Sequence, residues 1–163
     1  MKKLILIFLA TIFFKITIAV TVTSVVSGIW NDTTTWDSGI PSSGDNVVIA
    51  NGDTVSVGST QSCKNITINA GGILDLKLNS DLSTSATVTN DGSLTMENGS
   101  FTVGDGSSDY FKIPGGTLNF SGGVINVAGR YKQYSGGNAY LSGSVIMNIS
   151  TSGEQRFLCF WNR

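Results

Sequence analysis

Short stretches in which polar and apolar residues alternate recur from residue 46 to residue 149. Examples are "NVVI", "TVSV", "NITI", "ILDL" and "SLTM", each followed closely by Gly, Asn, Asp or Ser. Alternate residues of a β-strand point to opposite faces, so each stretch predicts a strand of about four residues with one buried face. The expected inward pairs include Val47 and Ile49, Leu74 and Leu76, Leu94 and Met96, Phe101 and Val103, Phe111 and Ile113, and Leu118 and Phe120.

The spacing of these strands distinguishes between all-β architectures. Successive strands start about six to eight residues apart, which is shorter than the ~8 to 12 residues typical of hairpin sandwiches. Every third strand places Leu74, Leu94 and Leu118 on one face, and Phe101, Ile125 and Val145 on another. We therefore expect an all-β fold, a right-handed single-stranded parallel β-helix with three sides. Its corners would need glycines with positive φ, such as those of "GG" at 115–116 and 122–123 and of Asp91-Gly92.

The stretch "SGIWNDTTTWDSGIPSSGDNVVI" precedes the first clean alternation. An open solenoid end exposes unpaired backbone, and large aromatic side chains can cover it. Trp30 and Trp36, with Pro41 and Asp45, are therefore interpreted as an N-terminal cap. The alternative is that the two indoles stack on sugar rings.

The chain divides into four predicted segments. Residues 1–19 carry two lysines, an apolar run and "TIA", which is typical of a signal peptide and too short for a membrane span. Residues 20–45 form the cap segment and residues 46–150 the β-helix coils. Residues 151–163 are interpreted as a truncated continuation of the same polypeptide, with capping of the last coil as the alternative.

Charge and composition exclude several functions. The 163 residues include 10 Lys and Arg, 11 Asp and Glu and no His. The absence of a basic cluster argues against nucleic acid, and the absence of His removes His-dependent nucleophiles and most catalytic zinc sites. We expect no cofactor and no enzymatic activity.

Two acidic pairs remain as candidate sites, the first for hydrolysis of a polysaccharide and the second for calcium. Asp75 and Glu97 are expected on one face one coil apart, but at different places along the strand and with no cation placed to tune them. Asp105 and Asp109 lie in a glycine-rich corner, where a calcium site is the alternative to a solvated loop.

The cysteines and three of the tyrosines are interpreted from their places in the predicted solenoid. Cys63 and Cys159 lie far apart in the predicted coil, so Cys63 is interpreted as a small buried residue rather than half of a disulfide. Tyr131, Tyr134 and Tyr140, in and near "GRYKQYSGGNAY", together with Asn and Thr ladders, could form a flat surface for sugars. The alternative is that these aromatic side chains cover the core where a strand is irregular.

The opening residues also carry a resemblance to a known group. "SGIWNDTTTWDSGIPSSGDNVVIANGDTVSV" and "CKNITINAGGILDL" resemble the start of exported bacterial surface proteins whose Gly-x-Trp opening precedes a Gly/Thr/Asn-rich β-helix. The resemblance implies adhesin-like proteins of Gram-negative bacteria, often exported by the type IX route with a C-terminal sorting domain. After "SVIMNIS" this chain shows no such domain.

The combined expectation is a secreted or cell-surface structural module, adhesin-like and without catalysis. Its expected partners are an extracellular polysaccharide or another surface protein, with no nucleic acid and no membrane span after signal cleavage. The alternatives are a carbohydrate-binding module and the incomplete front of a polysaccharide-degrading β-helix enzyme.

Overall fold

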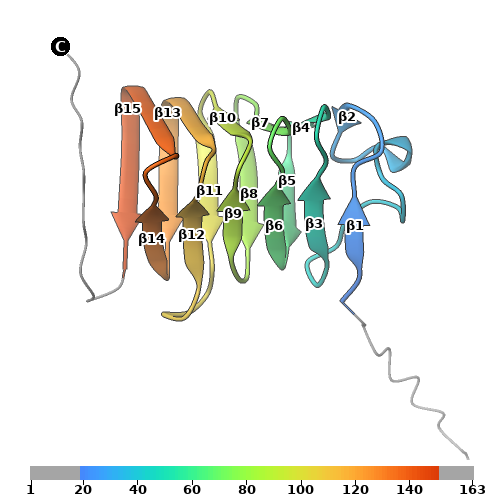
Figure 1. Ribbon diagram of the computed structural model, residues 1–163, viewed down its shortest axis with the longest axis horizontal. Coiled ribbons are helices and arrows are strands. Elements are labelled where there is room, and N and C mark those ends of the chain that lie inside the picture. Colours follow the sequence, from blue (N-terminus) through green and yellow to red (C-terminus); the bar gives the residue numbers. More distant parts are fainter. Residues whose placement is uncertain (1–18, 151–163) are drawn as a thin grey trace, which may run out of the picture.

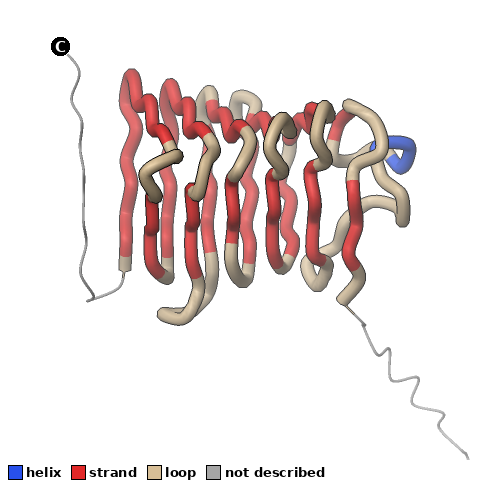
Figure 2. The backbone as a smooth tube through the Cα atoms, in the orientation of Figure 1, coloured by secondary structure: helices blue, strands red, loops and turns tan. Residues whose placement is uncertain are grey.

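Successive short strands wind into a parallel β-solenoid of about six turns (Figure 1). The computed structural model describes residues 19–150. Complete turns place strands on three faces, and corners join them (Figure 2). The predicted parallel β-helix is confirmed.

Face A is a six-stranded sheet that runs the length of the solenoid in Figure 1. Its strands are β1 (Thr21–Thr23), β3 (Asn46–Ile49), β6 (Asn65–Ile68), β9 (Val88–Asn90), β12 (Tyr110–Ile113) and β14 (Arg130–Gln133).

Faces B and C are the other two sides. Face B holds β2 (Gly28–Ile29), β4 (Thr54–Val57), β7 (Ile73–Leu76) and β10 (Ser93–Met96), and face C holds β5 (Thr60–Cys63), β8 (Ser80–Thr84) and β11 (Gly99–Val103). The long strands β13 (Thr117–Val127) and β15 (Asn138–Ile149) continue from face B around the corner to face C. The two faces therefore form one nine-stranded sheet.

The alternating pattern places apolar side chains in columns along the axis. Leu74, Leu94 and Leu118 are direct neighbours in β7, β10 and β13, and all three are fully buried. Phe101 and Phe111 meet edge to face, with ring centroids 5.7 Å apart. Each fully buried side chain of this size contributes ~1.5–3 kcal/mol, so the columns are a main source of stability.

The register differs from the prediction on face C. Ile125 has Met147 as its neighbour, and Val145 lies beside Gly123 instead. The cause is an irregularity after Phe120, where β15 has one more residue than β13, and Gly143 at this point has a φ of 63°. Alternation alone could not reveal an extra residue within a corner.

Most of the predicted corner glycines serve a different purpose from the one expected. Gly123 has a φ of 101°, but Gly92 and Gly116 are not among the residues with positive φ. At Gly92 a Cβ would lie 2.3 Å from the carbonyl oxygen of Gly72, and at Gly116 2.5 Å from that of Asn90. These corners need glycine because successive turns approach too closely for any side chain.

Candidate binding surface and acidic network

The segment before β3 forms part of the first turn as well as its cover. β1 pairs with β3 and β2 with β4, and a short 3-10 helix, η1 (Thr33–Thr35), lies between the two tryptophans. The Trp30 and Trp36 rings meet edge to face at 5.3 Å, and Trp36 Nε1 donates to the Trp30 carbonyl at 2.8 Å. Their exposed fractions are 1% and 4%, so neither ring offers a face to a sugar.

Asp45 and the buried Pro41 shape the approach to β3. Asp45 Oδ2 accepts hydrogen bonds from the Ser42 hydroxyl (2.6 Å) and backbone N–H (2.8 Å), and Oδ1 accepts one from the Val20 N–H (3.2 Å). These bonds, chiefly that from the Ser42 hydroxyl, lower the pKa of Asp45. The carboxylate therefore ties the start of β1 to the start of β3.

A shallow hollow of about 200 Å³ lies beside this cap. Its walls are Ile29, Trp30, Asn31, Ser56, Gly58 and Ser59. None of these residues carries a carboxyl, imidazole, thiol or amino group in its side chain.

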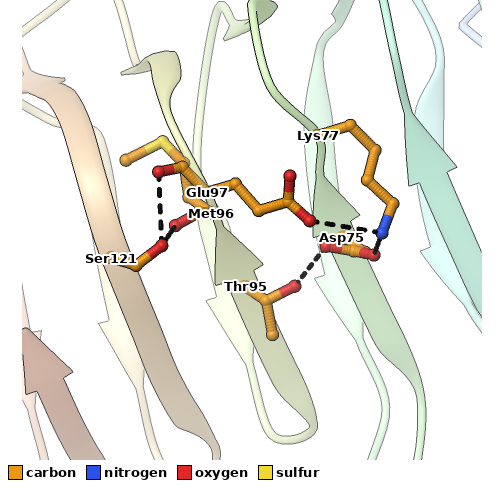
Figure 3. A network of polar contacts seen from close by, with 6 residues as sticks. All are labelled: Asp75, Lys77, Thr95, Met96, Glu97 and Ser121. Carbon is orange, nitrogen blue, oxygen red and sulfur yellow. Dashed lines mark hydrogen bonds and ion pairs between the residues drawn. The ribbon is translucent and has the colours of Figure 1, made fainter.

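Asp75 and Glu97 lie in one polar network on face B (Figure 3). Lys77 forms an ion pair with Asp75, and its Nζ is 3.6 Å from Glu97 Oε1. Thr95, the neighbour of Asp75 on the next turn, donates to Asp75 Oδ1 at 2.6 Å. The expectation that no cation lies near the two carboxylates is wrong, because Lys77 follows the inward Leu76 and turns out to the same surface.

The network favours the charged form of Lys77. The hydrogen bond and charge of Asp75 raise the pKa of Lys77, and Glu97 adds to this. Ser121 extends the contacts to a third turn, since its hydroxyl donates to the carbonyl of Glu97 at 3.2 Å. The arrangement connects neighbouring turns, as polar cross-strand pairs do in sheets.

The Asp109 side chain stabilises the corner in which it lies. Its Oδ2 accepts hydrogen bonds from the backbone N–H groups of Asp105 (3.0 Å) and Gly106 (2.9 Å). Within the described residues no group of three or more His, Cys, Asp or Glu side chains could hold a metal ion. The geometry of "GDGSSD" is thus explained by backbone hydrogen bonds within the corner.

Cys63 is buried at the end of β5 and carries a free thiol. Burial, and secondarily the charge of Asp45, raise its pKa to about 12, so the thiol is protonated at neutral pH. Cys159 lies outside the described residues.

The three predicted ligand-surface tyrosines lie in three different places. Tyr131 continues the core column: its ring meets Phe111 at 5.6 Å, and burial raises its pKa to about 12. Tyr134 follows β14 on face A and is 40% exposed, whereas Tyr140 is 62% exposed on face B beside Asn119. The structure does not bring them together.

A different group of side chains gathers on the outer surface of β12 and β14. Tyr110 and Lys112 point outward because Phe111 and Ile113 are buried, and Arg130 and Lys132 are their direct neighbours. Tyr134 extends the same surface. We call Tyr110, Lys112, Arg130, Lys132 and Tyr134 the basic tyrosine patch. The sequence shows a tyrosine next to basic residues in both "YFK" and "RYK". Only the pairing of β12 with β14 brings the two stretches together.

Comparison with known proteins identifies a family. The model of the G8 domain matches residues 35–122, more than half of the chain. The chain belongs to the G8 domain family. The family consists of β-helix-like extracellular domains. No curated protein and no solved structure matches the chain.

The G8 match maps onto the middle of the solenoid. It begins in η1 and ends at residue 122 within β13. Trp36, the acidic network and the β12 half of the basic tyrosine patch lie inside it, and β14 lies beyond it. Within the described part of this G8 chain, no helix is long and apolar enough to cross a membrane.

Proposed function

We propose that this G8 domain is an exported structural module of the cell surface, adhesin-like, without catalytic activity of its own. The observation that carries the proposal is the regular outer surface, on which polar side chains of successive turns bond to one another. Asn65 Nδ2 donates to Asn46 Oδ1 (2.7 Å) and Asn148 Nδ2 to Asn126 Oδ1 (2.9 Å). Together with the Thr95–Asp75 bond, these contacts favour flat, rigid faces suited to extended partners.

The leader and the family support the location. Residues 1–19 have the pattern of a signal peptide, and G8 domains belong to a family of extracellular domains. The resemblance of the Trp-rich opening to exported adhesin-like proteins, which often use the type IX route, supports the adhesin-like role. The proposed partners are an extracellular polysaccharide or another surface protein.

Surface exposure is tested in intact cells that produce the full chain. We expect an antibody to the solenoid to label intact cells or the medium, and the chain to lose its leader. The matched control is Leu9→Arg, which breaks the apolar run and should leave unprocessed chain inside the cell. An unprocessed wild-type chain in the cytoplasm would overturn the proposal.

The lack of catalysis is tested separately with the purified chain. Hydrolysis of a glycan by two carboxyl groups needs one of them as a proton donor. Lys77 is paired with both Asp75 and Glu97, so the two carboxylates belong to one ion-pair network, which supports a structural role. We expect no reducing ends or unsaturated products from neutral or acidic polysaccharides. Product release that Asp75→Asn abolishes would establish the enzyme alternative instead.

The carbohydrate-binding alternative is favoured by one specific observation, the basic tyrosine patch on face A. Binding of a glycan would be compatible with the surface role, since an adhesin-like module acts by binding an extracellular partner.

A further inference from the structure

The basic tyrosine patch concentrates positive charge on a small part of face A. The lysine and arginine residues between 19 and 150 are Lys64, Lys77, Lys112, Arg130 and Lys132, and the last three lie on β12 and β14. The chain as a whole has a net charge of −1. The clustering is therefore a local property of two neighbouring strands.

The register places like charges side by side. Lys112 is the direct neighbour of Lys132, and adjacent strands lie ~4.8 Å apart. Like charges in this position destabilise a sheet. In the described part of the chain, only Lys77 has a carboxylate within 4.0 Å, so the patch has no anionic partner of its own there.

Aromatic rings hold these cations instead. Lys112 Nζ lies 4.7 Å from the centre of the Tyr110 ring, and Lys132 Nζ 4.7 Å from that of Tyr134. Arg130 Cζ is 5.6 Å from the centre of the same Tyr110 ring, and Arg130 Nη1 donates to the Tyr110 hydroxyl at 2.8 Å. A lysine has three N–H donors and an arginine five, so a cation held over a ring keeps further donors for an anion. The patch therefore presents cations that are fixed in place and still able to bind an anion.

We propose that the basic tyrosine patch binds an acidic polysaccharide. Lys112, Arg130 and Lys132 would pair with the carboxylates or sulfates of the glycan, and the exposed ring of Tyr134 would pack against a sugar ring. The identity of the natural glycan rests on the proposed extracellular location, whereas the binding itself does not.

The size and surroundings of the patch favour a glycan over other polyanions. Nucleic acid affinity comes from neutralising many phosphates, and three cations supply few such contacts. A flat anionic membrane would also face the remaining surface of a chain whose acidic residues outnumber its basic ones. A single glycan chain can lie on β12 and β14 alone, where the carboxylate next to Tyr110, that of Asp109, already accepts hydrogen bonds from the Asp105 and Gly106 N–H groups.

The test uses the purified full chain and measures affinity for polygalacturonate by isothermal titration calorimetry. We expect binding that weakens as salt increases, because charge pairs are screened. The double variant Lys112→Gln/Lys132→Gln should lose at least tenfold in affinity. Lys64→Gln, a lysine elsewhere on the chain, serves as the matched control and should bind as wild type does.

Two further measurements separate charge from ring contact and glycan from other polyanions. Tyr134→Ala should weaken binding, and Tyr134→Phe, which keeps the ring, should restore it. Neutral dextran should not bind, and duplex DNA should bind more weakly than polygalacturonate. Circular dichroism verifies that each variant keeps its β-structure.

Three results would overturn the proposal: equal affinity of the double variant and wild type, equal binding of dextran, or tighter binding of DNA. None of these would affect the surface-labelling experiment, so the two proposals fail separately.

Discussion

At the scale of single residues, close stacking of turns determines which side chains the corners accept. Gly92 and Gly116 lie against backbone carbonyls of the preceding turn. Neither has a positive φ, so their requirement is one of space rather than of backbone conformation. Other residues fix corners through hydrogen bonds, as Asp45 and Asp109 do.

Gly92→Ala tests the requirement for space. The added Cβ would lie 2.3 Å from the Gly72 oxygen and must push the turns apart. We expect the free energy of unfolding in urea to fall by about 1–3 kcal/mol, as overpacking does elsewhere. The control is Gly58→Ala, where nothing lies within 4 Å and φ is not positive. Equal stability of the two variants would contradict this account.

Asp45 should make stability depend on acid pH. Hydrogen bonds, chiefly from Ser42, lower its pKa in the folded chain below the unfolded value of about 3.9. Such a group stabilises the fold above that value and loses this effect as the pH falls through the folded pKa. We therefore expect the stability difference between wild type and Asp45→Asn to shrink below about pH 4 in urea unfolding. A difference that stays constant down to about pH 2 would show that the carboxylate charge contributes nothing.

At the scale of elements, the sequence predicted the strands well and their lateral relations less well. Each inward pair, such as Leu94 and Met96, can be read from four consecutive residues because burial repeats every second position. Relations between turns depend on corner lengths, which is why the Ile125–Met147 pairing was missed. The same limit hid the approach of Lys77 to Glu97 on the next turn and the pairing of "YFK" with "RYK". The relation of Lys77 to Asp75 follows from alternation within "ILDLK" and could have been predicted. Tyr131 was expected on a sugar-binding surface, with covering of the core as the alternative, and its ring continues the Phe111 column.

Hydrogen bonds between the outer side chains of neighbouring strands should contribute to stability where they are sheltered. Asn65 donates to Asn46 and accepts from the Thr87 N–H at 2.9 Å, and it is partly buried. Asn65→Ala leaves both partners unpaired, and we expect a loss of about 1–3 kcal/mol in urea unfolding. Asn148→Ala removes one exposed bond on β15 and should cost no more than about 0.5 kcal/mol. Similar losses of unfolding free energy in both variants would contradict the idea that burial determines how much these hydrogen bonds contribute.

At the scale of the whole molecule, the two ends of the described solenoid differ. The N-terminal end is covered by the buried tryptophans and by the bonds of Asp45. At the other end, Tyr140, Leu141 and Ile146 of β15 are each more than half exposed, and Val145 and Met147 are only partly buried. In a solenoid each turn is stabilised mainly by its neighbours, so the turn of β14 and β15, which has a neighbouring turn on one side only in the described part of the chain, should open first.

Native-state hydrogen exchange, resolved by residue, measures this difference directly. We expect the amides of β6, β7, β9 and β10 to exchange only through global unfolding, because each of these strands has a turn on both sides. The amides of β14 and β15 should exchange faster, through local opening that leaves the earlier turns folded. Trp36→Ala should bring the protection of β1 and β3 down toward that of β14, since it removes the Nε1 bond to Trp30 and the edge contact between the rings. Uniform protection from β3 to β15 in the wild type would mean that the solenoid opens as one unit and that its last described turn is as stable as its centre.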